Sequence, residues 1–229
     1  MKFSLARRVC AEFLGTYFLV TAVVGSGIMG ERLSGGNTAI ALLANSIATG
    51  AALVTLILSL GEISGAHFNP VVTLFEASSG GLARTDVLPY LLAQFAGGMA
   101  GTISSHWMFG LAAVILSRHA RNGLAQFYSE VLATFGLLFV IAACSRLKAS
   151  AVPLAVGTYI AGAYWFTSST SFANPAVTVA RCITDTFAGI RPQDVPGFVS
   201  AQIVGAVAAF VVFRWLGRGA ISAESAASR

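Results

Sequence analysis

Two short stretches of this chain, 105 residues apart, are closely alike. The first reads His-Phe-Asn-Pro-Val-Val-Thr over 67–73, and the second reads Phe-Ala-Asn-Pro-Ala-Val-Thr over 172–178. Proline suits the first turn of a helix, where its missing N–H is not needed, and the asparagine before it is a good N-cap. Each stretch therefore predicts the start of a short helix whose positive dipole end carries a free carboxamide. Two such ends at the middle of a membrane would form a pore that accepts polar solutes and repels cations.

The composition places the chain in the membrane class. Of its 229 residues, 56% are hydrophobic and only 10% are charged, whereas a soluble domain carries about 25% charged residues. A membrane span needs about 20 apolar residues, so the length allows six spans with short loops. The net charge of +5 is spread between apolar runs, which favours an interpretation as membrane topology and predicts no nucleic-acid partner. The three cysteines follow no metal or disulfide spacing, and no metal or cofactor is expected.

The chain is predicted to be a duplicated half. Three markers recur in the same order, namely Glu12-Leu14-Thr16 as Glu130-Leu132-Thr134, Asn69-Pro70 as Asn174-Pro175, and Ala93-Gln94-Gly97 as Ala201-Gln202-Gly205. Internal repetition of this kind indicates two copies of one structural unit. The repeats are expected to cover 1–120 and 121–229, and together they form one channel domain.

Each repeat holds three long apolar segments, and three is an odd number. The segments are expected at 9–29, 38–60 and 87–115, and again at 125–145, 151–167 and 194–216. The second repeat must therefore start from the opposite side of the membrane, which makes an inverted repeat. The runs 69–78 and 174–184 are too short to cross and are interpreted as re-entrant half-helices. Irregular backbone at that depth is tolerated only where it lines a cavity or is buried in protein, so a cavity is implied.

The basic residues predict the orientation. With both termini on one side, that side carries Lys2, Arg7, Arg8, Arg84, Arg146, Lys148, Arg214, Arg218 and Arg229, and the other carries Arg32, Arg118, Arg121, Arg181 and Arg191. Nine against five favours cytoplasmic termini.

These features resemble the major intrinsic protein family, the aquaporins and aquaglyceroporins, over nearly the whole chain. The resemblance rests on the Ser64-Gly65-x-His67-Phe68-Asn69-Pro70 loop, the paired Asn-Pro motifs (Asn69-Pro70-Val71 and Asn174-Pro175-Ala176), the paired glutamates, and the paired Ala-Gln-x-x-Gly of the third and sixth spans. It implies an all-α membrane protein with six transmembrane helices and two half-helices meeting at mid-membrane. It also implies a homotetramer with one pore per subunit, in a cell inner membrane.

The departures from the family pattern concern the narrowest ring of the pore. The family normally has Arg three residues after the second Asn, where this chain has Val177. Counting back from the motifs gives Thr49 for the second span, where water channels usually have Phe, and Ser171 for the loop. The same count gives Gly162 for the fifth span, where water channels usually have His, and one gap would move this position to Ala161 or Ala163.

A ring of Thr49, Gly162, Ser171 and Val177 predicts a wide opening with one apolar wall and two hydroxyls. Pore diameter and lining hydrogen-bond groups set selectivity in such channels. The expected function is passive passage of water and small neutral solutes such as glycerol, urea and the neutral triol form of arsenite. The arsenite expectation comes from the resemblance to bacterial aquaglyceroporins linked to arsenic resistance.

Four further polar residues carry alternative interpretations. Glu12 and Glu130 are acids inside apolar spans, and they either hold the backbone N–H groups of the re-entrant loops or relay protons. His67 is expected to line the inner pore, with a pH gate as an alternative. Arg181 is one turn beyond Val177 and is either a displaced selectivity charge at the outer mouth or a partner of a lipid headgroup or loop.

Three rival functions remain at this point. A strict water channel is the nearest, and Trp165 or Arg181 would then narrow the outer mouth. An ion-coupled secondary transporter also has inverted repeats and broken helices, but it needs charged or carbonyl coordination near the midplane. An enzyme is not expected, because the chain has no metal-ligand cluster and no arrangement of Ser, His and Asp for nucleophilic catalysis.

Overall fold

The structure is a computed structural model, and it describes residues 2–216. Arg218 and Arg229, which entered the count of basic residues, lie outside the described residues. In the described part the chain forms six long helices and two short ones. The long helices are α1 (Leu5–Leu33), α2 (Thr38–Ser64), α4 (Arg84–Met108), α5 (Leu124–Leu147), α6 (Val152–Phe166) and α8 (Val195–Leu216), and the short ones are α3 (Pro70–Ser78) and α7 (Pro175–Ala180). Short 3-10 turns follow at Ala149–Ala151, Arg181–Ile183 and Pro192–Asp194.

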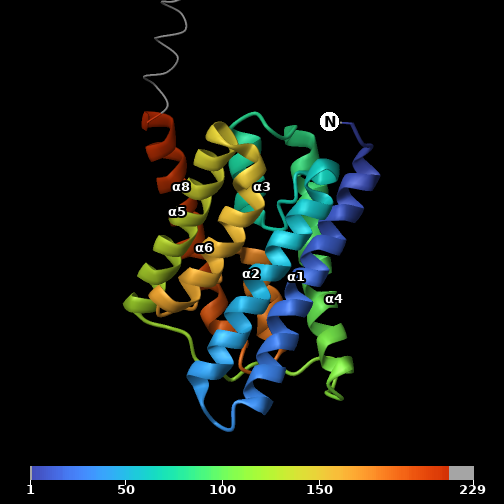
Figure 1. Cartoon of the computed structure of the whole chain (residues 1–229), viewed down its shortest axis with the longest axis vertical. Helices are drawn as coiled ribbons and strands as arrows, with labels where there is room; N and C mark the ends of the chain where they lie inside the picture. Colours follow the sequence, from blue (N-terminus) through green and yellow to red (C-terminus); the bar gives the residue numbers. More distant parts are fainter. Residues whose placement is uncertain (1, 217–229) are drawn as a thin grey trace, which may run out of the picture.

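The long helices run side by side along the long axis of the molecule (Figure 1). The N-terminus and the last turn of α8 lie at the same end of this bundle, which is called the N-terminal end below. Helix α3 lies in the half of the bundle nearer this end, and α7 lies in the half nearer the opposite end. Helices α5 to α8 thus repeat the arrangement of α1 to α4 with the opposite orientation along the long axis of the molecule.

The starts of the short helices follow from their Asn-Pro pairs. The Asn69 side chain accepts a hydrogen bond from Val71 N at 3.0 Å, and the Asn174 side chain accepts from Ala176 N and Val177 N at 3.0 and 3.2 Å. Pro70 and Pro175 occupy the first turn, where no N–H is required. Both short helices therefore begin where the sequence predicts, at the centre of the bundle.

Glycines let the long helices approach closely. A Cβ atom on Gly97 of α4 would overlap Phe13 O of α1, and one on Gly205 of α8 would overlap Val131 O of α5. Small residues at such crossings are typical of helices that pack in lipid. The two crossings occupy equivalent positions in the two repeats, so they set the same helix pairing in each half.

Helix α4 ends earlier than its predicted span, whereas α6 agrees with its predicted span to within one residue at each end. Helix α4 ends at Met108, not near 115, because the chain turns at Gly110 (φ 69°) and then runs beside the 3-10 turn after α7, with Ile115 N donating to Ile183 O at 3.1 Å. Helix α6 has only 15 residues, which span about 22 Å. Among the described helices, α1, α2, α5 and the segment containing α8 are long and apolar enough to cross a membrane.

Candidate channel site

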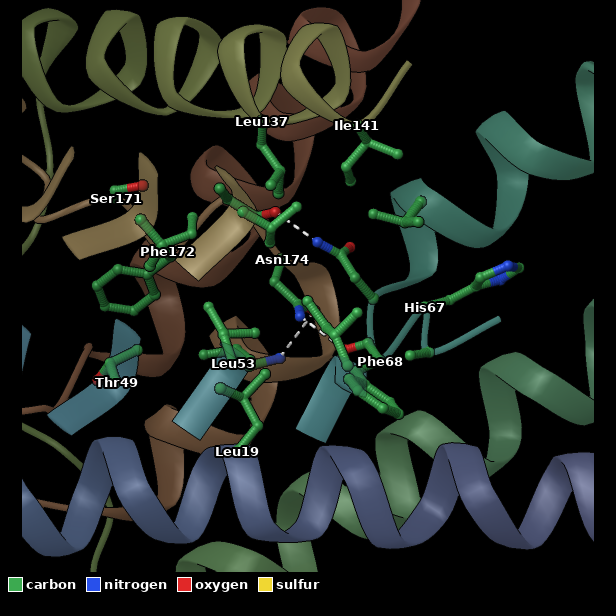
Figure 2. A pocket seen from close by; sticks show the side chains of 18 of the residues that line it. Leu19, Thr49, Leu53, His67, Phe68, Leu137, Ile141, Ser171, Phe172 and Asn174 are labelled. Atoms are coloured by element: carbon green, nitrogen blue, oxygen red, sulfur yellow. Dashed lines mark hydrogen bonds between the residues drawn. The ribbon is translucent and has the colours of Figure 1, made fainter. Parts of the chain in front are cut away.

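An elongated cavity of about 280 Å³ runs through the centre of the bundle. Figure 2 shows Ser171, Phe172 and Thr49 toward one end, His67 toward the other, and Asn174 between them. Much of the lining is apolar and comes from the long helices, through Leu19, Val23, Leu53, Leu137, Ile141, Val156 and Ile160. The irregular segments that lead into α3 and α7 complete the lining and present polar groups. The cavity therefore offers a solute both hydrocarbon and hydrogen-bonding groups.

The two half-helices are joined at their starts by reciprocal hydrogen bonds. Asn69 Nδ2 donates to Ala173 O at 2.7 Å, and Asn174 Nδ2 donates to Phe68 O at 2.8 Å. Each carboxamide nitrogen has a second hydrogen, and both asparagines line the cavity. The midpoint of the cavity thus has two donors and the positive ends of two helices, which favour the oxygen of a neutral solute over a cation.

The segments before α3 and α7 have an unusual backbone. Ala66 and Phe68 have φ values of 50° and 49°, and Ser171 and Ala173 both have φ of 48°. A residue with a side chain adopts this left-handed region at a cost, so the surrounding structure must hold it there. Equivalent residues in both repeats share this conformation, which indicates that it is part of the site.

Buried glutamates hold these segments. Glu12 accepts hydrogen bonds from Ser64 Oγ (2.6 Å), His67 N (3.0 Å), Phe68 N (2.7 Å) and Gln94 Nε2 (2.8 Å). The Glu12 carboxylate is fully buried, so these bonds replace the water that it has lost.

Glu130 plays the same part in the second repeat. It accepts from Phe172 N and Ala173 N, both at 2.9 Å, and from Gln202 Nε2 at 2.7 Å. Neither glutamate lines the cavity. The structure therefore places both acids as loop supports, which was the first of their two sequence interpretations.

Of the four predicted ring residues, the structure brings three to the cavity. Thr49, Ser171 and Val177 line it, and all three are buried. Gly162 does not: it lies on the exposed outer face of α6, and the expectation for it is corrected. Its proposed substitutes Ala161 and Ala163 do not line the cavity either.

Tyr164, and not Gly162, is the residue in this turn of α6 that lines the cavity. The residues of α6 that line the cavity are Val152, Val156, Ile160 and Tyr164. They are spaced four apart, and residues at that spacing share one face of a helix. Gly162 lies halfway between the last two and so faces away. This row of apolar residues is visible in the sequence and would have identified Tyr164.

Thr49, Tyr164 and Ser171 each bring a hydroxyl group to the lining of the cavity, and not all of these hydroxyls have a hydrogen-bond partner among residues 2–216. Thr49 Oγ1 and Tyr164 OH lie 3.2 Å apart and share a hydrogen bond. Ser171 Oγ is buried and has no hydrogen-bond partner within the described residues. Because a buried hydroxyl without a partner is costly, Ser171 is a group that a solute in the cavity can satisfy.

Arg181 also lines the cavity, at the end opposite to His67. Its side chain is only 2% exposed, its Nε donates to Ala188 O, and its guanidinium carbon lies 3.3 Å from the centre of the Phe172 ring. The structure therefore places it inward, one turn beyond Val177, and not toward lipid.

Arg121 reinforces this end of the molecule from behind the cavity wall. Its side chain donates to Gly189 O at 2.8 Å, Ser169 O at 3.2 Å and Phe187 O at 3.4 Å. Burial lowers the pKa of Arg121, which lies in the connection before α5, to about 10, so it stays charged at neutral pH. These bonds fix the two loops that carry Ser171 and Ala188.

The N-terminal end of the cavity is lined by His67 and Glu76. The ring nitrogen Nδ1 of His67 lies 3.1 Å from Thr73 Oγ1, which in turn accepts from Gln94 Nε2 at 2.9 Å. Over residues 2–216, no group of three or more His, Cys, Asp or Glu side chains is arranged to hold a metal ion.

Comparison with known proteins places this site in context. The family model described as "Major intrinsic protein" matches residues 1–162. The chain is 55% identical to the aquaglyceroporin AqpS of Rhizobium meliloti (strain 1021), over 94% of this chain and 92% of that protein. It is 31% identical to the probable aquaporin AqpM of Archaeoglobus fulgidus, over 95% and 100% of the two chains. In fold it is similar to the crystal structure of the aquaglyceroporin from Plasmodium falciparum, with a TM-score of 0.71 at 21% identity over 93% of this chain and 96% of that one.

Proposed function

The chain belongs to the major intrinsic protein family, and we propose that it is a passive channel for small neutral solutes such as glycerol and urea, as well as for water. The observation that carries this proposal is the mixed lining of the cavity, in which apolar side chains surround a path that also passes the donors of Asn69 and Asn174. A polyol has a hydrocarbon edge and a hydroxyl edge, and this lining matches both.

The selectivity ring supports solute passage in addition to water passage. Val177 presents an apolar side chain where the family usually has Arg, and Thr49 is smaller than the Phe of water channels. Tyr164 makes the ring narrower than one containing Gly162 would be. We propose Thr49, Tyr164, Ser171 and Val177 as the ring, and we extend the solutes to the neutral triol of arsenite because of the likeness to aquaglyceroporins.

A strict water channel is the second candidate, and two observations favour it. Tyr164 and Arg181 are both large, and both line the same end of the cavity. An ion-coupled transporter is less well supported, because the buried acids Glu12 and Glu130 are occupied by loop N–H groups and glutamines.

The assembly follows from the same family membership. We propose a homotetramer with one pore per subunit in the inner membrane of the cell. We place both termini in the cytoplasm on the basic-residue count, so that α7 and Arg181 face outward and α3 and His67 face inward.

The test is stopped-flow light scattering of vesicles that contain the purified protein. An impermeant osmolyte reports water flux, and a glycerol gradient reports solute flux. We expect the native protein to speed both. Val177→Arg should abolish glycerol flux and spare water flux, because the guanidinium fills the ring.

The control is Val177→Thr, which keeps the size of the side chain and should retain glycerol flux. A native protein that passes water and no glycerol would instead assign the strict water channel. Solute flux that depends on a proton gradient would assign a transporter.

A further inference from the structure

We propose that the end of the cavity near Ser171 is a binding site for a small monovalent oxyanion of the carboxylate type, held by the guanidinium of Arg181 and the hydroxyl of Ser171. The proposal rests on the proposed function only in requiring that this end of the cavity be reached from solution. It adds a ligand of a different charge class from the neutral solutes.

The first step concerns Arg181, a buried positive charge that has no carboxylate in ion-pair contact among residues 2–216. The ion pairs within residues 2–216 join Arg8 to Asp86, Arg118 to Asp185, and Arg191 to Asp194. Arg181 uses its Nε on Ala188 O, and its two Nη groups make no hydrogen bond to any described residue. Buried charges in proteins are normally paired with an opposite charge. This guanidinium lines the cavity and has free donors, so an anion in the cavity could pair with it.

The second step is the surplus of positive charge around it. Arg121 and Arg181 lie against the same ring, at 5.0 and 3.3 Å from the centre of Phe172. The carboxylate of Asp194 that accepts from Arg121 N is already paired with Arg191. The negative charge of Glu130 acts on both arginines, but its carboxylate is held by backbone N–H groups, and it offsets only one of the two positive charges. Two cations in a site of low dielectric attract an anion more strongly than they would in water.

The third step is the geometry of the free donors. The Nη groups of arginine form a planar fork that matches two carboxylate oxygens, and hydrogen bonds of this kind are stronger than neutral ones. Ser171 Oγ, 3% exposed and without a partner among the described residues, supplies a further donor on the same part of the lining. The other acidic or basic side chains that line the cavity, His67 and Glu76, belong to its far end, so no carboxylate of the lining pairs with the Arg181 guanidinium.

The experiment measures how acetate affects glycerol flux in vesicles. Acetate is placed on both sides of the membrane at pH 7.5, where it is almost fully ionised, and sodium chloride at the same ionic strength is the reference. We expect acetate to slow glycerol flux through the native protein in a saturable way, because it occupies the outer part of the path. Chloride has one charge but no pair of oxygens, and it should have much less effect.

Three variants assign the effect to the site. Arg181→Gln should raise the acetate concentration for half-inhibition by about tenfold or more, since it removes the charged fork. Ser171→Ala removes only the unpartnered hydroxyl and should raise it severalfold. Arg118→Ala removes a positive charge whose side chain is 90% exposed, and it should leave the inhibition unchanged.

Two results would overturn the proposal. One is that acetate slows native flux no more than chloride does. The other is that Arg181→Gln or, if that variant does not fold, Ser171→Ala is inhibited like the native protein. If the native protein passes no glycerol, the proposed function fails, and the same acetate series is then followed by water flux and still decides whether the site exists.

Discussion

At the scale of single residues, the hydroxyl groups of the proposed ring differ in whether they already have a hydrogen-bond partner. Thr49 and Tyr164 satisfy each other at 3.2 Å, while Ser171 and the second hydrogens of Asn69 and Asn174 remain for a solute. Tyr164 thus acts both as a wall and as a partner that restrains Thr49. Within the proposed ring Tyr164 is the largest side chain, so we expect it to have the greatest effect on the width.

Replacing Tyr164 with Ala should widen the ring and release the hydroxyl of Thr49. We expect Tyr164→Ala to increase the flux of four-carbon polyols severalfold relative to water, because the ring of Tyr164 no longer narrows the cavity. The measurement is light scattering with erythritol and with an impermeant osmolyte.

Gly162→Ala is the matched control on the same helix. An added Cβ there meets only the Phe166 ring, at 3.9 Å, on the exposed face. This variant should transport like the native protein. A loss of solute flux in Gly162→Ala would return Gly162 to the ring and contradict the assignment of Tyr164.

The sequence predicts the residues whose roles depend on local chemistry. It does not predict a pore-lining position correctly when that position is found by counting residues across a loop. The Asn-Pro caps and the loop-supporting glutamates follow from capping and from the cost of a buried acid, and the structure shows their contacts. The error at Gly162 arose because a residue count from Asn174 carries no information about the face of α6. The inward direction of Arg181 depends on Ala188 and Phe172, which no local pattern connects to it.

At the scale of the elements, the half-helices work because the long helices around them approach closely. Helix α3 has nine residues and α7 has six, and isolated helices of this length are not stable in water. Their stability comes from the cage of α1, α4, α5 and α8. The small residues at the α1–α4 and α5–α8 crossings are therefore as important for the pore as the residues that line it.

Enlarging Gly97 should separate α1 from α4. A side chain there overlaps the backbone of Phe13, so Gly97→Val should destabilise the protein by about 1–3 kcal/mol or more. Equilibrium unfolding in mixed micelles of a mild detergent and dodecyl sulfate measures this change.

Gly61→Ala provides the comparison within α2. No atom lies within 4 Å of a Cβ added at Gly61, and alanine in a helix interior is favoured over glycine by about 0.5–1 kcal/mol. The two substitutions should therefore have opposite signs. Equal destabilisation by both would show that the α1–α4 crossing is not tight.

At the scale of the whole molecule, the two repeats form one site that neither half contains alone. Asn69 of the first repeat is bonded to Ala173 of the second, and Asn174 is bonded to Phe68. Glu12 holds the segment before α3, and Glu130 holds the segment before α7. A substitution of either glutamate is therefore expected to disturb both half-helices.

Glu12→Gln and Glu130→Gln should each destabilise the protein by about 2 kcal/mol or more, because an amide leaves buried donors without an acceptor. The double variant should lose less than the sum of the two, since the loops that they hold contact each other. Unfolding free energies from a double-mutant cycle in mixed micelles measure this coupling.

Glu62→Gln, on the exposed surface of α2, is the control for removal of a negative charge and should be near neutral. Strict additivity of the two buried substitutions would mean that the repeats support their half-helices independently.

The reciprocal bonds between the half-helices also constrain the order in which the protein can be made. The acceptor for Asn69 lies on Ala173, 104 positions later in the chain, so it does not exist while the ribosome is still completing the first repeat. The donor for Phe68 O, on Asn174, is likewise absent at that stage, and polar groups left unsatisfied in hydrocarbon are costly. The first re-entrant segment must therefore wait, near the membrane surface or among water, until the second has been synthesised and inserted. A pore whose two halves complete each other's hydrogen bonds in this way is therefore expected to be finished late in biosynthesis, after the second repeat has entered the membrane.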